Sequence, residues 1–108
     1  MYSLYSEDGS FIGESISIKW DFSGYAIHSS GTKSYWLDGR IHRKNDAAVL
    51  YVDGGNSYYE YGKPHRIGGP AVIYPNKTKE FWIDGKEVTE LEHNLLYDMM
   101  KLKGLIEL

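Results

Sequence analysis

The chain has 108 residues, a net charge of −3 and no cysteine. Its length is that of a single domain with one modest core. The absence of cysteine excludes a disulfide framework, a thiolate metal site and a cysteine nucleophile. Nucleic-acid binders usually present a basic face, so the acidic balance predicts no nucleic-acid partner. No segment resembles a signal peptide or a membrane span, which predicts a cytoplasmic protein without a transmembrane segment.

Residues 1–22 predict an atypical hairpin at the start of the fold. The pair Asp8-Gly9 is a turn signal, because glycine after aspartate readily adopts a positive φ. Apolar residues then alternate with polar ones: Ile16, Ile18, Trp20 and Phe22. This period of two predicts a strand with one apolar face.

Residues 23–88 repeat themselves with a period of 23. Gly39, Gly62 and Gly85 lie 23 residues apart. Aromatic pairs precede these glycines: Tyr35-Trp36, Tyr58-Tyr59 and Phe81-Trp82. Basic pairs follow the first two glycines: His42-Arg43 and His65-Arg66. A fixed period of this size predicts a stack of similar supersecondary units.

Each 23-residue unit is predicted to hold two strands joined at its glycine turn. The fold class is therefore mainly β, an antiparallel meander of hairpins. Successive residues of a strand point to opposite faces, so the aromatic pairs predict two ladders. Trp36, Tyr59 and Trp82 would line one face, and the other member of each pair would line the opposite face. Such ladders could stack nucleobases, but packing over a thin sheet agrees better with the acidic composition.

Residues 89–108 predict a C-terminal helix and tail that pack on the sheet. Thr89 and Glu92 form a capping-box pattern, and Gly104 is a stop signal, so we expect a helix over residues 89–103. Apolar residues at helical spacing form a stripe: Leu91, Leu95, Leu96, Met99, Met100 and Leu102. We expect the helix to cover the last edge or a face of the sheet, with Glu90, Glu92 and His93 on its solvated face. The apolar tail, residues 105–108, would pack on the helix or dock on another chain.

The repeat letters resemble a known family. Trp36-x-x-Gly39-x-x-His42 and its copy 23 residues later are similar to the core of MORN repeats, which are β-hairpin units of this length. The chain is similar to the variant that continues His-Arg-x-x-Gly-Pro-Ala, which residues 65–71 match in full. The first copy replaces Gly-Pro with Asp46-Ala47, and the third ends as the helix begins. The resemblance covers residues 23–88.

The resemblance implies a scaffold or binding module rather than an enzyme. Small stand-alone proteins of this variant are similar to accessory proteins of bacteria, phages and large viruses. It therefore implies a phage or bacterial accessory protein that inhibits a partner protein by covering its working surface.

The best candidates for a binding surface are the basic pairs of the repeat and the acidic start of the helix. Basic residues outnumber acidic ones in residues 39–66, whereas acidic ones dominate residues 84–98. The candidate partner-binding residues are Arg40, His42, Arg43, His65, Arg66, Glu90 and His93. The structural alternative stays open: each histidine would cap turn backbone, and each arginine would pair with a carboxylate or stack on an aromatic ring.

No catalytic or metal-binding pattern occurs in the sequence. It has no Walker loop, no G-x-S-x-G elbow and no HExxH motif, so we predict neither an enzyme nor a bound metal or cofactor. Three functions remain open. The first is docking on a protein partner, as a monomer or small homo-oligomer. The others are binding of a small anionic ligand, such as a nucleotide or lipid head group, by the His-Arg surface, and self-assembly into a structural protein.

Overall fold

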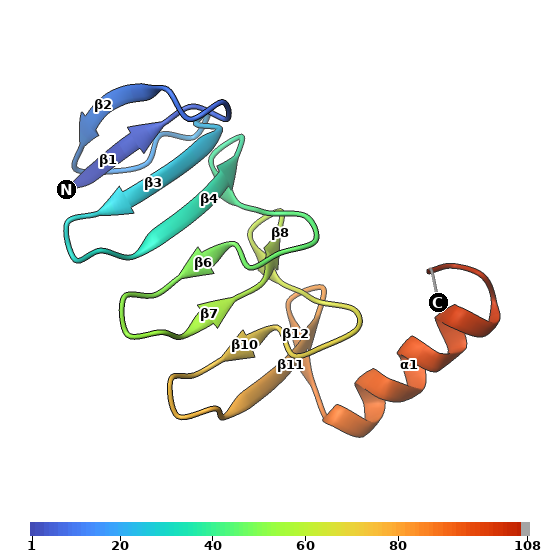
Figure 1. Ribbon diagram of the computed structural model, residues 1–108. Helices are drawn as coiled ribbons and strands as arrows, with labels where there is room; N and C mark the ends of the chain where they lie inside the picture. The colour runs from blue at the N-terminus through green and yellow to red at the C-terminus, as the bar shows by residue number, and fades with distance from the viewer. Residues whose placement is uncertain (107–108) are drawn as a thin grey trace.

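A computed structural model describes residues 1–106 as a stack of β-hairpins followed by one helix (Figure 1). The molecule is elongated, with principal extents of 46 × 30 × 21 Å. Strands pair only in antiparallel fashion in the described part of the chain, which confirms the predicted mainly-β fold with one C-terminal helix. No helix among residues 1–106 is long and apolar enough to cross a bilayer.

Twelve strands form the stack. The first four are β1 (Tyr2–Tyr5), β2 (Phe11–Ser15), β3 (Gly24–His28) and β4 (Lys33–Leu37). The next four are β5 (Arg40–Ile41), β6 (Val49–Leu50), β7 (Asn56–Ser57) and β8 (Tyr59–Glu60). The last four are β9 (Lys63–Pro64), β10 (Val72–Ile73), β11 (Lys79–Ile83) and β12 (Lys86–Val88). The main sheet runs in the order β12-β11-β10-β7-β6-β4-β3-β1-β2, with β5 beside β4, while β8 and β9 pair separately.

The N-terminal segment departs from the prediction. Strand β1 lies between β2 and β3, so the chain must cross from one side of β1 to the other between them. Residues 16–23 make this crossing without forming a strand, and the strand predicted there is wrong. Ile16 and Trp20 are 82% and 83% exposed, whereas Phe22 is buried. Alternation alone could not form a strand because both sides of β1 are already occupied by other strands.

The strand register of the repeat recurs with a shift of 23 residues. Ala26 pairs with Ser34, Val49 with Ser57, and Val72 with Glu80. Each unit nevertheless differs from the simple two-strand hairpin that the sequence predicts. The returning chain forms a short strand, β5 or β9, and leaves the sheet in a loop. It then rejoins the sheet as β6 or β10. The loops turn at equivalent positions, where Asn45 and Gly68 have positive φ.

The tight turns form as predicted. In each turn the residue before glycine has φ between 48° and 53°, and the glycine has φ between 73° and 82°. Two successive positive φ angles are the signature of the type I′ hairpin turn. These turns are Asp38-Gly39, Tyr61-Gly62 and Asp84-Gly85.

The helix α1 (Glu90–Leu102) has the predicted caps. Thr89 and Glu92 bond reciprocally in a capping box, and these hydrogen bonds lower the pKa of the Glu92 carboxyl. Gly104, with φ of 69°, follows the last turn, and Leu105 N–H donates to the Met100 carbonyl, as in a Schellman motif. Sequence signals close to each terminus therefore determined both helix boundaries.

The orientation of α1 differs from the prediction. Its main strand partner is β11, yet the apolar stripe does not face the sheet. Leu91 and Leu102 are 69% and 89% exposed, and the stripe residues between them, Leu95 and Met99, are exposed as well. His93 is the residue that the helix buries, with 2% exposure, so its predicted place on the solvated face is wrong. Periodicity located the stripe, but tertiary contacts rotated it outward.

Candidate functional site

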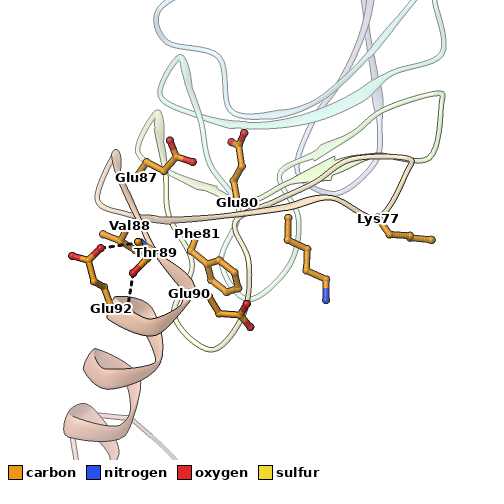
Figure 2. A pocket seen from close by; sticks show the side chains of 9 residues that line it. Lys77, Glu80, Phe81, Glu87, Val88, Thr89, Glu90 and Glu92 are labelled. Carbon is orange, nitrogen blue, oxygen red and sulfur yellow. Dashed lines mark hydrogen bonds between the residues drawn. The ribbon is translucent and has the colours of Figure 1, made fainter.

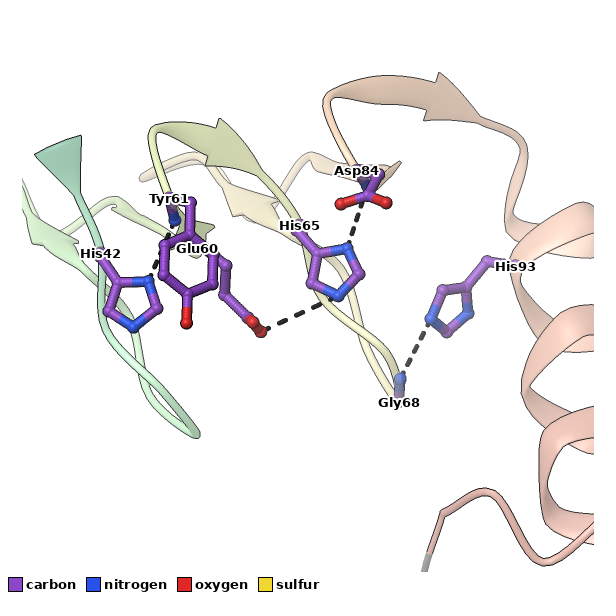
Figure 3. Close-up of polar contacts among 7 residues, drawn as sticks. All are labelled: His42, Glu60, Tyr61, His65, Gly68, Asp84 and His93. Atoms are coloured by element: carbon purple, nitrogen blue, oxygen red, sulfur yellow. Dashed lines mark hydrogen bonds and ion pairs between the residues drawn. The ribbon is translucent and has the colours of Figure 1, made fainter.

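The repeated histidines hold one unit to the next. His42 Nδ1 accepts the Tyr61 N–H at 3.0 Å, and His65 Nδ1 accepts the Asp84 N–H at 2.9 Å (Figure 3). Both donors are the first positive-φ residue of the following tight turn. Ser23 Oγ accepts the equivalent Asp38 N–H at 2.9 Å in the preceding unit. Each side chain thus satisfies a backbone donor that the turn leaves free.

The repeated arginines stack on the first member of each aromatic pair. The guanidinium carbon of Arg43 lies 3.9 Å from the Tyr35 ring centroid, and that of Arg66 lies 4.0 Å from the Tyr58 centroid. Each Nη1 also donates to a loop carbonyl, of Ala47 at 3.2 Å and Pro70 at 3.1 Å, respectively. These contacts are those expected of the structural alternative, since one arginine fixes both a ring and a loop.

His93 takes the place of a third arginine. Its ring centroid lies 5.0 Å from that of Phe81, which is the third-unit equivalent of Tyr35 and Tyr58. Its Nε2 accepts the Gly68 N–H at 3.1 Å, so the helix is tied to the loop of the preceding unit (Figure 3). His93 therefore belongs to the packing of the molecule and not to an accessible surface, contrary to its prediction as a partner-binding residue.

Replacing Arg66 with alanine should lower the free energy of unfolding by about 1–2 kcal/mol. The variant loses a cation–π contact and a hydrogen bond to a part-buried carbonyl. Arg40→Ala is the matched control, since Arg40 is exposed and should cost less than about 0.5 kcal/mol. Urea denaturation measures both variants. Equal midpoints for Arg66→Ala and the unsubstituted protein would show that the stacking contributes nothing.

The predicted site residues do not converge on one site. Arg43, His65 and Arg66 line a cavity of about 400 Å³ together with Tyr97 of the helix. Glu60 lines the same cavity, and its carboxylate lies 3.8 Å from His65 Nε2. The cavity therefore holds an acidic group among its basic ones.

The remaining predicted residues lie elsewhere. Glu90 borders a second cavity, of about 730 Å³, at the start of α1 (Figure 2). Arg40 is exposed on β5, and His42 packs against the Tyr61 ring at 4.3 Å between centroids. In the tail, Leu105 is exposed and Ile106 lines the cavity of Arg43, while residues 107–108 lie outside the described residues.

The exposed stripe of α1 is the feature that sequence reasoning misassigned. Its four exposed residues are Leu91, Leu95, Met99 and Leu102, and we call them the helix stripe. Acidic residues lie around it at Glu90, Glu92 and Asp98. The sequence signal was strong, but it was interpreted as packing because amphipathic helices usually bury their apolar side. The described residues provide no cover for this stripe.

Comparisons with known proteins returned no match. A scan against family models matched none, and neither the curated proteins nor the solved structures contained a similar protein. Within residues 1–106, no three histidine, aspartate or glutamate side chains gather closely enough to hold a metal ion.

Proposed function

We propose that the protein is a non-catalytic interaction module that docks on a partner protein through the helix stripe. The observation that carries this proposal is the position of α1, which buries His93 against the sheet and leaves Leu91, Leu95 and Leu102 exposed. Contiguous exposed apolar surface on a folded domain is typical of a protein interaction site. An amphipathic helix that lays its apolar side in a groove is a recurrent mode of such recognition.

The helix is preorganised for docking. The capping box and the Schellman motif satisfy backbone groups at both ends, and His93 anchors it to the sheet. A helix that is already ordered loses less conformational entropy on binding than a segment that folds on its partner. The surrounding carboxylates favour an apolar groove with a basic rim, because complementary charge steers association and excludes other partners.

The biological role that we propose is that of a cytoplasmic accessory protein that inhibits its partner by occlusion. The MORN-like repeat would act as the scaffold, and α1 would cover the working surface of the partner. The elongated stack supports this role, since it adds bulk beside a docked helix and can block access to a neighbouring site.

The test combines Leu91→Gln with Leu95→Gln. A photo-crosslinking amino acid at position 99 should capture one protein at one-to-one stoichiometry, and the double variant should weaken that complex at least tenfold. Each buried leucine typically contributes about 1.5–3 kcal/mol to such a contact. Both leucines are exposed in the free chain, so the melting temperature should change little.

Ile16→Gln is the matched control because Ile16 is equally exposed but lies at the opposite end of the stack. It should leave the complex intact. Capture that survives the double variant would contradict docking through the helix stripe. Crosslinking between two copies of the chain, with light scattering from a dimer, would support self-assembly instead.

A second candidate function is the binding of a small anion. The observation in its favour is that Arg43, Arg66 and His65 line one cavity of about 400 Å³. Saturating ligand raises the melting temperature by mass action, so thermal shift with phosphate, nucleotides and phosphoinositides tests it. We expect a weak effect at most, since both guanidinium groups already contact loop carbonyls and Glu60 shares the cavity. A clear shift that Arg43→Gln abolishes would establish the anion site.

A further inference from the structure

A groove of about 480 Å³ opens beside the ladder residues Tyr59 and Trp82, away from the helix stripe. Four aromatic side chains line it: Tyr51, Tyr59, Tyr74 and Trp82. They come from two successive repeat units, so stacking of the units creates the groove. Tyr51 and Tyr74 occupy equivalent positions in the turns that follow β6 and β10.

Glu80 supplies a carboxylate to this groove. Its Oε2 accepts the Tyr74 hydroxyl at 2.8 Å, and its Oε1 accepts the Trp82 Nε1–H at 3.0 Å. The bond to Glu80 raises the pKa of the Tyr74 hydroxyl, which therefore stays a neutral donor. No salt bridge joins Glu80 to any cation in residues 1–106. The groove contains a second carboxylate, Asp53, and no lysine or arginine lines it.

The carboxylate is a departure from the repeat. The two earlier units have serine at the equivalent positions, Ser34 and Ser57. In the first unit, Trp36 Nε1–H donates to Ser34 Oγ at 2.8 Å, which is the same contact made to a neutral acceptor. A serine therefore satisfies the indole, and the packing of the ladder does not require a negative charge at position 80.

We propose that this groove binds the methylated ammonium group of a small organic cation, such as choline. Aromatic faces attract cations through the ring quadrupole, and quaternary ammonium groups are the usual ligands of aromatic-lined sites. Methylated ammonium carries few or no N–H donors, so it enters an aromatic site without leaving strong hydrogen bonds unsatisfied. Glu80 supplies the counter-charge, held in place by Tyr74 and Trp82.

The test follows the indole N–H signal of Trp82 by two-dimensional NMR during titration with choline. Its neutral isostere, 3,3-dimethylbutan-1-ol, has the same shape without the charge. We expect choline to shift the Trp82 signal in a saturable way and the isostere to bind at least tenfold more weakly. Equal affinity for the two would reduce the groove to a hydrophobic site and overturn the proposal. Absence of saturable binding up to tens of millimolar choline would overturn it too.

Glu80→Ser restores the residue of the earlier units and so should fold. Glu80→Gln keeps the acceptor and removes only the charge. Both should weaken choline binding about tenfold, which is ~1.4 kcal/mol. Glu87→Gln, a carboxylate outside the groove, is the control for net charge and should bind normally. Unchanged affinity in Glu80→Gln would exclude the carboxylate from the site.

Two further titrations identify where the methylated ammonium group comes from. Binding of trimethyllysine but not lysine would indicate a modified side chain, whereas binding to phosphatidylcholine vesicles would indicate a lipid head group. Response to free choline alone would indicate a soluble metabolite. The helix stripe does not line the groove, so Leu91→Gln with Leu95→Gln should leave choline binding unchanged. Failure of the docking proposal would therefore not affect this one.

Discussion

Gly39→Ala should lower the free energy of unfolding by roughly 3 kcal/mol or more, whereas Gly62→Ala should cost only about 1 kcal/mol. The two glycines occupy equivalent positions in successive units, with φ of 73° and 81°. Both substitutions place an L-residue in the left-handed region, and that cost is shared. They differ in what a Cβ atom would meet.

A Cβ on Gly39 would collide with the carbonyl group of Trp20 and lie 2.6 Å from its Cα. At Gly62 the nearest atom is Arg40 Cβ at 3.6 Å, which is an ordinary contact. Main chain cannot rotate away as a side chain can, so Gly39→Ala must displace the crossing segment, residues 16–23. Urea denaturation of both variants measures the difference. Equal losses of stability would mean that this segment does not pack on the first turn.

His93→Ala should detach the helix from the sheet at a cost of about 3 kcal/mol. The variant loses aromatic packing on Phe81 and leaves the Gly68 N–H without its acceptor. An isolated helix of this length is marginal in water, so an undocked α1 should also unfold. Circular dichroism at 222 nm should then be lost at a lower urea concentration than the tertiary signal of the sheet.

Leu95→Ala provides the control for this prediction. It lies on the same helix but is exposed, so it should change stability by less than about 0.5 kcal/mol. His93→Gln offers a partial rescue, because its amide oxygen can accept the Gly68 N–H. A single cooperative transition in His93→Ala, with unchanged midpoint, would contradict the anchoring role of His93.

Much of the fold could be predicted from local sequence signals. Positive φ at Asp38-Gly39 and at its copies, the capping box of Thr89 and the stop at Gly104 all depend on residues adjacent in the chain. The 23-residue period then carried one unit's geometry to the next, and the register followed it. The aromatic pairs also pointed to opposite faces, since alternation is a property of the strand itself.

The errors concern segments whose environment is set by distant residues. Residues 16–22 alternate as a strand would, but the pairing of β1 with β3 left them no partner. The candidate surface of basic pairs became a set of internal contacts once the next unit supplied the turn for His42 and the ring for Arg66. His93 could not be identified as their counterpart, because it reaches Phe81 from outside the repeat.

The sequence by itself determined the repeat unit, its turns, the extent of the helix and the existence of an apolar stripe. Local sterics and hydrogen bonds between near neighbours are sufficient for each of these. Only the tertiary structure decided which side of the helix faces the sheet and where Glu80 meets its aromatic neighbours. Rotation of a helix about its axis and the approach of two stacked units depend on contacts such as His93 with Gly68, between residues far apart in the chain. Those contacts turned the helix stripe into an available docking surface.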